Sequence, residues 1–284
     1  MTFFEIALYF SIMSVLNNWW LIPSLIMVLS GILCSAIGTA LIYKKKLLNA
    51  NLISDTILPG LIISIAIGLH PLIGGFIGGL IGALLSELPS FNKNRNTASV
   101  INIFTFGMFG FGLSIIPLLG IRIDLEAFLF GDLLTSKLSD LMIMLAPSVV
   151  LFIFFFLTFF IGKATYSEFN KQSDPANSIK DFLYNLCLNF TAILVITSST
   201  RALGFFVVIP FLSIPSILGL EKRVPNLPFA MVISSIFGLT ISTTGLLVSI
   251  IFNFAPGPLI ATICLLLLVA KFFVKDLINF FKNI

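Results

Sequence analysis

One carboxylate in this chain borders a long apolar run, where an ionisable side chain is energetically expensive. It belongs to Asp55, within the segment 49–60, NANLISDTILPG. Asn51 precedes it by four residues, so a helix would place both side-chain oxygens on one face. Carboxylate and amide oxygens suit a hard divalent cation such as Mn²⁺. The pair therefore predicts part of an ion path, and the alternative is that Asp55 caps a helix at its cytoplasmic mouth.

A second group of acids lies in the segment 124–134, DLEAFLFGDLL. Glu126 and Asp132 stand there among large apolar residues. Acids at the entrance of a pore would concentrate cations around it, so both residues are candidates for the metal pathway. The competing interpretation is a surface helix whose acids lie in water.

Other residue types that bind metals or catalyse reactions are scarce. His70 is the only histidine and has no partner nearby in the sequence, so we interpret it as a turn or interface residue. The cysteines Cys34, Cys187 and Cys264 lie singly in apolar runs without CxxC spacing, which argues against a disulfide framework or a zinc knuckle. No GxxxxGK[ST] segment occurs, so the chain has no P-loop for ATP. We predict neither a catalytic residue nor a bound cofactor.

The composition indicates whether these residues lie in water or in a membrane. The chain is 58% hydrophobic and 10% charged, with a mean hydropathy of +1.12, whereas soluble domains carry about 25% charged residues. Its apolar runs reach the length that a helix needs to cross hydrocarbon and lack the alternation of a transmembrane β-strand. The sequence predicts a single all-α domain over residues 1–284, a polytopic transmembrane helical bundle surrounded by lipid.

The apolar runs predict eight or nine spans, preceded by an interfacial lead-in helix at 1–18. The Ile57–Pro59 and Pro210–Pro215 segments are candidate helix breaks. The nine ranges are Trp19–Tyr43, Leu52–Leu69, Pro71–Leu88, Ala98–Gly120, Leu141–Gly162, Phe182–Thr200, Leu203–Leu220, Pro228–Phe252 and Pro258–Phe273.

The basic residues predict the orientation. Of the 16 Lys and Arg, all but Arg122, Lys137 and Arg201 fall in alternate loops. Cytoplasmic loops carry the excess of basic residues, so the N-terminus is predicted outside and the C-terminus in the cytoplasm. The basic residues are spread along one side of a membrane, so the pI of about 9.0 does not indicate a nucleic-acid partner.

Glycines are concentrated in the third predicted span. Glycines four residues apart let two helix backbones approach closely. We interpret them as packing positions within the bundle, with a dimer interface as the alternative. The five are Gly74, Gly75, Gly78, Gly79 and Gly82.

Four segments together resemble the permeases of zinc/manganese-type ABC importers. The stretch 43–60 is similar to the basic turn and "GDALSHAVLPG" segment of that family, and 125–134 to its "hfLFGdiL" stretch. The segment 202–208 resembles its "AVGvlLV" helix, and 245–260 its "GlylSyyldlpsGpaiv" close. The four matches keep the order and rough spacing of the family from about residue 20 to 270.

The chain also departs from this pattern. The Asp–x3–His pair of the family is replaced by Asn51 and Asp55, and the acidic pair that opens its fourth span by Asn96 and Thr97. The family's "FDPEyArslG" stretch is reduced to SDPA at 173–176. Zinc favours nitrogen and sulfur ligands more than manganese does. An oxygen-only pair therefore favours Mn²⁺, with Zn²⁺ or iron as alternatives.

The resemblance implies a transport subunit and its partners. Permeases of this family work as dimers, between an extracytoplasmic metal-binding protein and two cytoplasmic ABC ATPase subunits. The longest internal cytoplasmic loop, residues 163–181, would be the ATPase-coupling loop, with Asp174 and Pro175 forming a turn before a short interfacial helix. The metal ion is then cargo rather than a cofactor.

Two questions stay open at the level of sequence. An ATP-independent secondary transporter or channel is the alternative function, since such carriers have broken helices near mid-membrane. The expected location is a cell (inner) membrane in a multi-pass arrangement. A plastid membrane is the alternative, because the composition rich in Phe, Ile, Asn and Lys is typical of an AT-rich genome.

Overall fold

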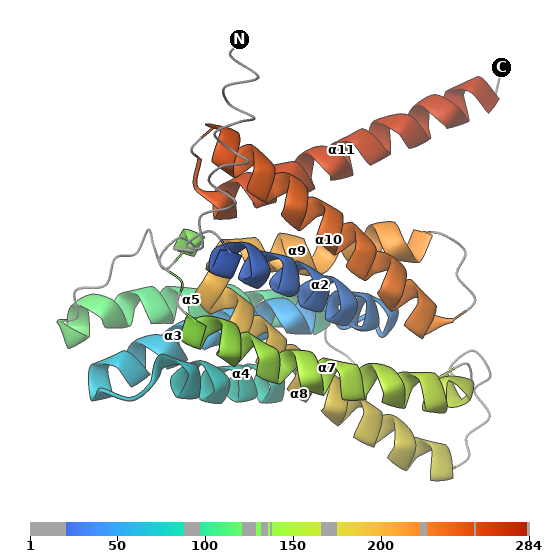
Figure 1. Cartoon of the computed structure of the whole chain (residues 1–284). Helices are drawn as coiled ribbons and strands as arrows, with labels where there is room; N and C mark the ends of the chain where they lie inside the picture. Colours follow the sequence, from blue (N-terminus) through green and yellow to red (C-terminus); the bar gives the residue numbers. More distant parts are fainter. Residues whose placement is uncertain are drawn as a thin grey trace, which may run out of the picture.

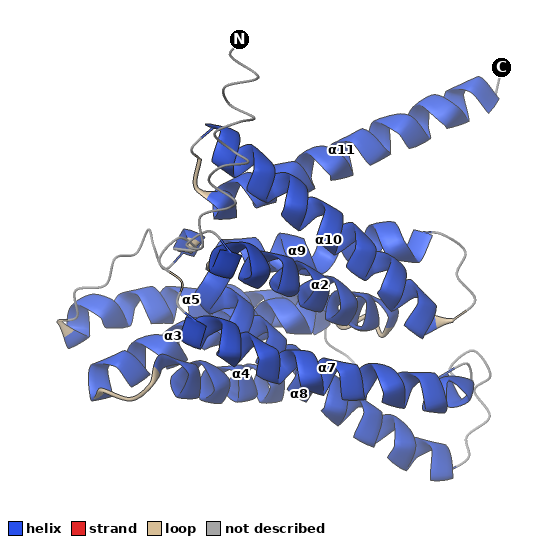
Figure 2. Ribbon diagram, in the orientation of Figure 1, coloured by secondary structure: helices blue, strands red, loops and turns tan. Residues whose placement is uncertain are grey.

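A computed structural model describes most of the chain, and helices joined by short loops make up the described part (Figure 2). The described ranges are 21–87, 97–120, 129–131, 136, 138–165, 175–221, 226–252 and 254–282. They form α2 (Leu21–Tyr43), α3 (Leu47–Ile67), α4 (Pro71–Glu87), α5 (Thr97–Leu119), α7 (Leu138–Thr165), α8 (Pro175–Leu203), α9 (Phe205–Glu221), α10 (Leu227–Phe252) and α11 (Pro256–Lys282). The predicted all-α class is confirmed.

Each of the nine predicted runs coincides with one of these helices. Within the described residues, six helices are long and apolar enough to cross a membrane: α2, α3, α5, α10 and the apolar parts of α7 and α11. The apolar helices α4 and Phe205–Leu220 are shorter. The total of eight or nine spans therefore stays a prediction, as does the orientation, and the predicted lead-in helix at 1–18 lies outside the described residues.

The candidate helix breaks do not occur. Helix α3 continues through Pro59, and α9 continues through Pro210 and Pro215. Proline is tolerated in membrane helices because neighbouring helices and polar side chains compensate for the missing backbone hydrogen bond.

Helix α2 lies in the middle of the bundle, where it packs against α7, α8, α9 and α10 (Figure 1). Its small residues permit these contacts. Gly38 lies against the backbone of Leu212 in α9, and Gly31 against that of Gly238 in α10. The Ser216 hydroxyl donates a 2.9 Å hydrogen bond to the Ser35 carbonyl, which also joins α9 to α2.

Helices α3 and α4 form a closely packed pair, and α5 covers another side of α3. The five glycines of α4 are all buried. Gly74 lies against the backbone of Gly60 and Gly78 against that of Thr56, while Gly75 and Gly79 face side chains of α3 and α8. A side chain at these positions would push the two helices apart.

The predicted coupling loop is partly a long helix. Residues 166–174, Asp174 included, lie outside the described residues, whereas Pro175 is the first residue of α8. Proline suits this position because the first backbone N–H groups of a helix have no intrahelical partner. The expected short interfacial helix is therefore replaced by an unbroken helix that runs on to Leu203.

Candidate ion pathway

Asp55 lies deep in α3 and does not cap the helix. The helix begins at Leu47, five residues earlier than the predicted span, with Lys46 at the capping position. Asp55 is thus about 12 Å along the helix axis from its start. The side chain is 6% exposed and is the only charged one in α3. Among the described residues, no hydrogen bond or ion pair to Asp55 is found.

Asn51 and Asp55 share their face of α3 with two apolar residues. Leu58 and Ile62 follow at helical spacing and form a buried cluster with Phe205 at the start of α9. Phe109 of α5 completes this cluster, and its ring stacks on that of Phe205 with centroids 5.5 Å apart. The face therefore changes from polar at Asn51 and Asp55 to a closed apolar contact one turn further along α3.

A glycine-rich junction lies next to the apolar cluster. Gly131 and Gly204 have φ values of 80° and 86°, which other residues rarely adopt. Their backbones lie against one another, and Gly257, near the start of α11, lies against the Phe130 carbonyl. The segment 129–131 is thereby held beside the junction of α8 and α9. Glu126 and Asp132 lie outside the described residues, so their part in the metal pathway stays a prediction.

The opposite end of α3 carries charged contacts. The Lys46 ammonium group lies 2.7 Å from the Glu87 carboxylate at the end of α4. The Lys44 Nζ atom lies 5.2 Å from the centre of the Tyr184 ring in α8, within the range of a cation–π interaction. The basic turn between α2 and α3 is thereby tied to both α4 and α8.

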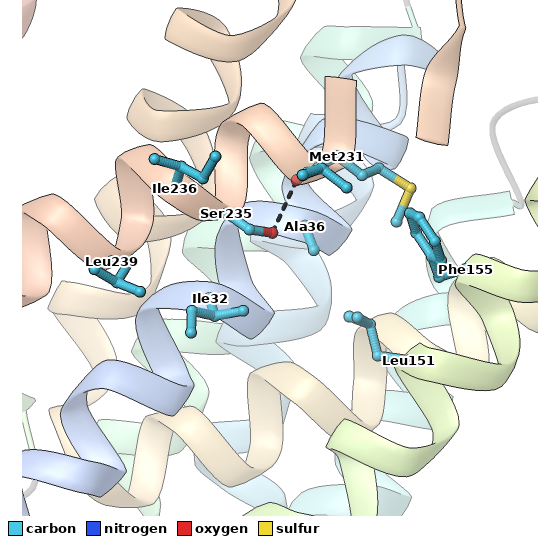
Figure 3. Close-up of a pocket in the computed structure, with 9 residues that line it drawn as sticks. Ile32, Ala36, Leu151, Phe155, Met231, Ser235, Ile236 and Leu239 are labelled. Carbon is cyan, nitrogen blue, oxygen red and sulfur yellow. Dashed lines mark hydrogen bonds between the residues drawn. The ribbon is translucent and has the colours of Figure 1, made fainter. Parts of the chain in front are cut away.

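Two grooves on the bundle lack the polar atoms that an ion would need. The first, about 200 Å³ in volume, lies between α2, α7 and α10 and is lined by Ile32, Ala36, Leu151, Phe155, Met231, Val232, Ser235, Ile236 and Leu239 (Figure 3). The Ser235 hydroxyl donates a 2.8 Å hydrogen bond to the Met231 carbonyl of its own helix (Figure 3). The second, about 240 Å³, lies between α3, α4 and α5. Its hydroxyls, on Thr56 and Ser64, donate in the same way to α3.

The remaining metal-binding residue types do not converge. Within the described residues, no group of three or more His, Cys, Asp or Glu side chains could hold a metal ion. His70 is exposed in the turn between α3 and α4. The three cysteines are free, and the Cys34 thiol donates a 3.3 Å hydrogen bond to the Ser199 hydroxyl.

Sequence reasoning did not identify the aromatic contact beside Asp55 or the charged contacts at the end of α3. Phe109 and Phe205 belong to a chain with 31 phenylalanines, so no local signal distinguishes them. Lys46 and Glu87 are 41 residues apart. The only signal for their pairing was that Lys46 precedes the second predicted span and Glu87 lies at the end of the third, on the same predicted side of the membrane.

Comparison with known proteins bears on this arrangement. The model of a family described as the ABC 3 transport family matches residues 19–275. The manganese transport system membrane protein MntC of Halalkalibacterium halodurans is 28% identical over 249 residues, which are 87% of this chain and 84% of that protein. The chelated iron transport system membrane protein YfeD of Yersinia pestis is 25% identical over 254 residues, which are 88% and 82% of the two chains.

A solved structure shares the fold. The structure of PsaBC from Streptococcus pneumoniae in complex with a Fab superposes with a TM-score of 0.72 and covers 90% of both chains. The sequence identity is 22%, so this similarity concerns the arrangement of the helices.

Proposed function

Since the chain belongs to the ABC 3 transport family, we propose that it is the membrane-spanning permease subunit of an ABC importer for a divalent metal ion. Manganese is the favoured cargo, with iron or zinc as alternatives. The relative named for manganese transport supports the first choice and the relative named for chelated iron transport supports the second. The oxygen-only pair Asn51 and Asp55 also favours manganese over zinc.

The observation that carries the proposal is the buried carboxylate of Asp55. A carboxylate at 6% exposure within an apolar helix is costly to keep charged without a counter-ion. A passing divalent cation would supply that counter-ion, and the Asn51 carbonyl oxygen, one turn away on the same face, would add a neutral ligand. These residues also occupy the place where the resembling family carries its Asp–x3–His pair.

The apolar cluster would close the path on the outer side. Leu58, Ile62 and Phe205 lie beyond Asp55 in the direction of the Gly131–Gly204 junction, which is the outer end in the proposed orientation. A hydrated ion cannot pass a dry contact of this kind. Entry of the ion would therefore require α3, α5 and α9 to separate at this contact.

Partner subunits complete the proposed importer. The sequence contains no P-loop motif, so ATP hydrolysis would belong to a separate ABC ATPase, and we place its docking site at residues 163–181, around Asp174 and Pro175. A second copy of the permease and an extracytoplasmic metal-binding protein complete the assembly. The ATP-independent alternative relied on broken helices, and α3 and α9 are continuous at their prolines.

Replacing Asp55 by asparagine tests the proposal. Asp55→Asn keeps the shape of the side chain and removes its charge. We expect manganese uptake to fall by about 10- to 100-fold, because an interaction with a charged ligand contributes about 1.5–3 kcal/mol. Uptake of radioactive Mn²⁺ by cells that contain all the importer subunits, normalised to the amount of permease in the membrane, measures the effect.

A matched variant controls for the loss of an acid as such. Asp140 lies in the first turn of α7, away from the Asn51–Asp55 face, so Asp140→Asn should leave uptake near the wild-type level. Normal uptake by Asp55→Asn would show that the carboxylate is not part of the ion path. Uptake by the purified permease without any ATPase would favour the gradient-driven alternative.

A further inference from the structure

Four buried oxygen atoms along α3 and α8 differ from most other polar groups of the bundle. Most Ser and Thr hydroxyls donate to a carbonyl of their own helix, as Ser30, Thr39 and Thr200 do. The hydroxyls of Ser54 and Thr197 and the side-chain carbonyl oxygens of Asn185 and Asn189 are buried without a hydrogen-bond partner among the described residues. Burying a polar atom without a partner costs free energy, so these atoms call for an explanation.

The contacts with α4 show how α3 and α8 are aligned. Gly75 lies against Leu61 of α3 and Thr197 of α8. Four residues later, α4 lies against Ile57 and Ile193. As the residue number rises along α4, the numbers of the residues that it contacts in α3 and α8 fall. Helices α3 and α8 therefore run in the same direction, antiparallel to α4.

This alignment places three of the four oxygens along one stretch of the α3–α8 contact. Ser54 precedes Ile57 by three residues and Asn189 precedes Ile193 by four, so each lies one turn beyond that contact on the same face of its helix. Ser54 and Asn189 are therefore at the same level of the bundle. Asn185 follows one turn further along α8. We call Ser54, Asn189 and Asn185 the column, since they follow one another along the α3–α8 contact. The Thr197 hydroxyl, level with Leu61, lies two turns from Asn189 toward the other end.

The column connects two features already described. The end of the column that lies deeper in the bundle is Ser54, the residue next to Asp55 in the chain. Its other end is Asn185, which follows Tyr184, the residue whose ring faces the Lys44 ammonium group. The Lys46–Glu87 ion pair lies at the same end of α3. The column therefore runs from the level of Asp55 in α3 to the charged end of the bundle, which is cytoplasmic in the proposed orientation.

Hydroxyl and amide oxygens suit a hydrated cation in transit. They accept hydrogen bonds from its water molecules or replace single waters, and without a negative charge they do not hold the ion firmly. We propose that Ser54, Asn189 and Asn185 line the inward half of the pathway, along which a hydrated divalent cation moves from Asp55 to the Lys46–Glu87 end. This inference rests on the proposed function, since it takes Asp55 to be the preceding ligand.

The first test is uptake by Asn189→Leu, which keeps the approximate side-chain volume and removes the oxygen. We expect manganese uptake about tenfold below wild type at equal membrane abundance, because the ion loses a partner inside the bundle. The control is Thr191→Val on the same helix. The Thr191 hydroxyl already bonds the Cys187 carbonyl and lies off the column, so its uptake should match wild type. Wild-type uptake by Asn189→Leu beside a failing Asp55→Asn would overturn the column and leave the proposed function intact.

The second test detects the column without relying on transport. Asn189→Cys and Thr191→Cys are each placed in a full-length chain whose native cysteines are replaced by alanine, and inside-out vesicles are treated with a hydrophilic thiol reagent. We expect the cysteine at 189 to react faster than the one at 191 and to be protected by Mn²⁺ alone. Equal reaction rates at the two positions, or no effect of Mn²⁺ at 189, would overturn the inference.

Discussion

At the scale of single residues, the choice of ligand atoms would control which ions pass along the proposed path. Manganese accepts carboxylate, carbonyl and water oxygens, whereas zinc gains more from imidazole nitrogen. Asn51 and Asp55 offer oxygen alone, at positions where the resembling family has an aspartate and a histidine. The buried position of Asp55 in α3 means that its side chain would meet the ion with few competing waters.

Changing the ligand atom should therefore change the preference of the path. We expect Asp55→His to raise the ratio of zinc to manganese uptake by about tenfold, equivalent to about 1.4 kcal/mol, because it introduces a nitrogen ligand and removes a charge. Competition between the two ions in the same uptake assay measures the ratio. Asp55→Glu retains the carboxylate and should leave the ratio unchanged. A transporting Asp55→His variant with the wild-type ratio would mean that Asp55 does not select the ion.

At the scale of helices, the close approach of α3 and α4 depends on the absence of side chains. A methyl group at Gly78 would collide with the backbone of Thr56, whereas one at Gly107 in α5 would meet nothing within 4 Å. Backbone cannot yield as a flexible side chain can. Because Thr56 is next to Asp55, the packing of α4 also determines where α3 presents its carboxylate.

Gly78→Ala should destabilise the protein, and Gly107→Ala should not. Forcing a methyl group into a filled contact costs about 1–3 kcal/mol. Alanine at the open position in α5 should be neutral or slightly stabilising, since it favours the helix more than glycine does. The apparent melting temperature of each purified variant in the same detergent measures the difference. Equal melting temperatures would show that the α3–α4 contact tolerates separation.

Several features of these helices could be predicted from the sequence. Apolar length alone located the nine helices of the described ranges, and the resemblance to metal-ion ABC permeases is confirmed by the family match. The prolines suggested breaks that the neighbouring helices prevent. Asn185 and Asn189 are four residues apart in an apolar run, which indicates a polar stripe on one face of a helix. The sequence does not show which helix that stripe faces. That is decided by packing between segments more than 100 residues apart, such as α3 and α8.

At the scale of the whole molecule, the two ends of the bundle differ in chemistry. One end holds Lys44, Lys46 and Glu87 in contacts between α2, α3, α4 and α8. The other holds the Gly131–Gly204 junction beside an apolar cluster. Basic residues are retained on the cytoplasmic side of membranes, so this asymmetry agrees with an inward-facing charged end.

The orientation can be tested with single cysteines in loops that lie outside the described residues. In a chain without native cysteines, Asn92→Cys and Ser173→Cys should resist an impermeant thiol reagent added to intact cells, because both loops belong to the basic side. Asn253→Cys, between α10 and α11, should react. Permeabilised cells provide the control, since all three cysteines should then be labelled. Labelling of position 92 or 173 in intact cells would reverse the orientation, and the column between α3 and α8 would then lead outward from Asp55.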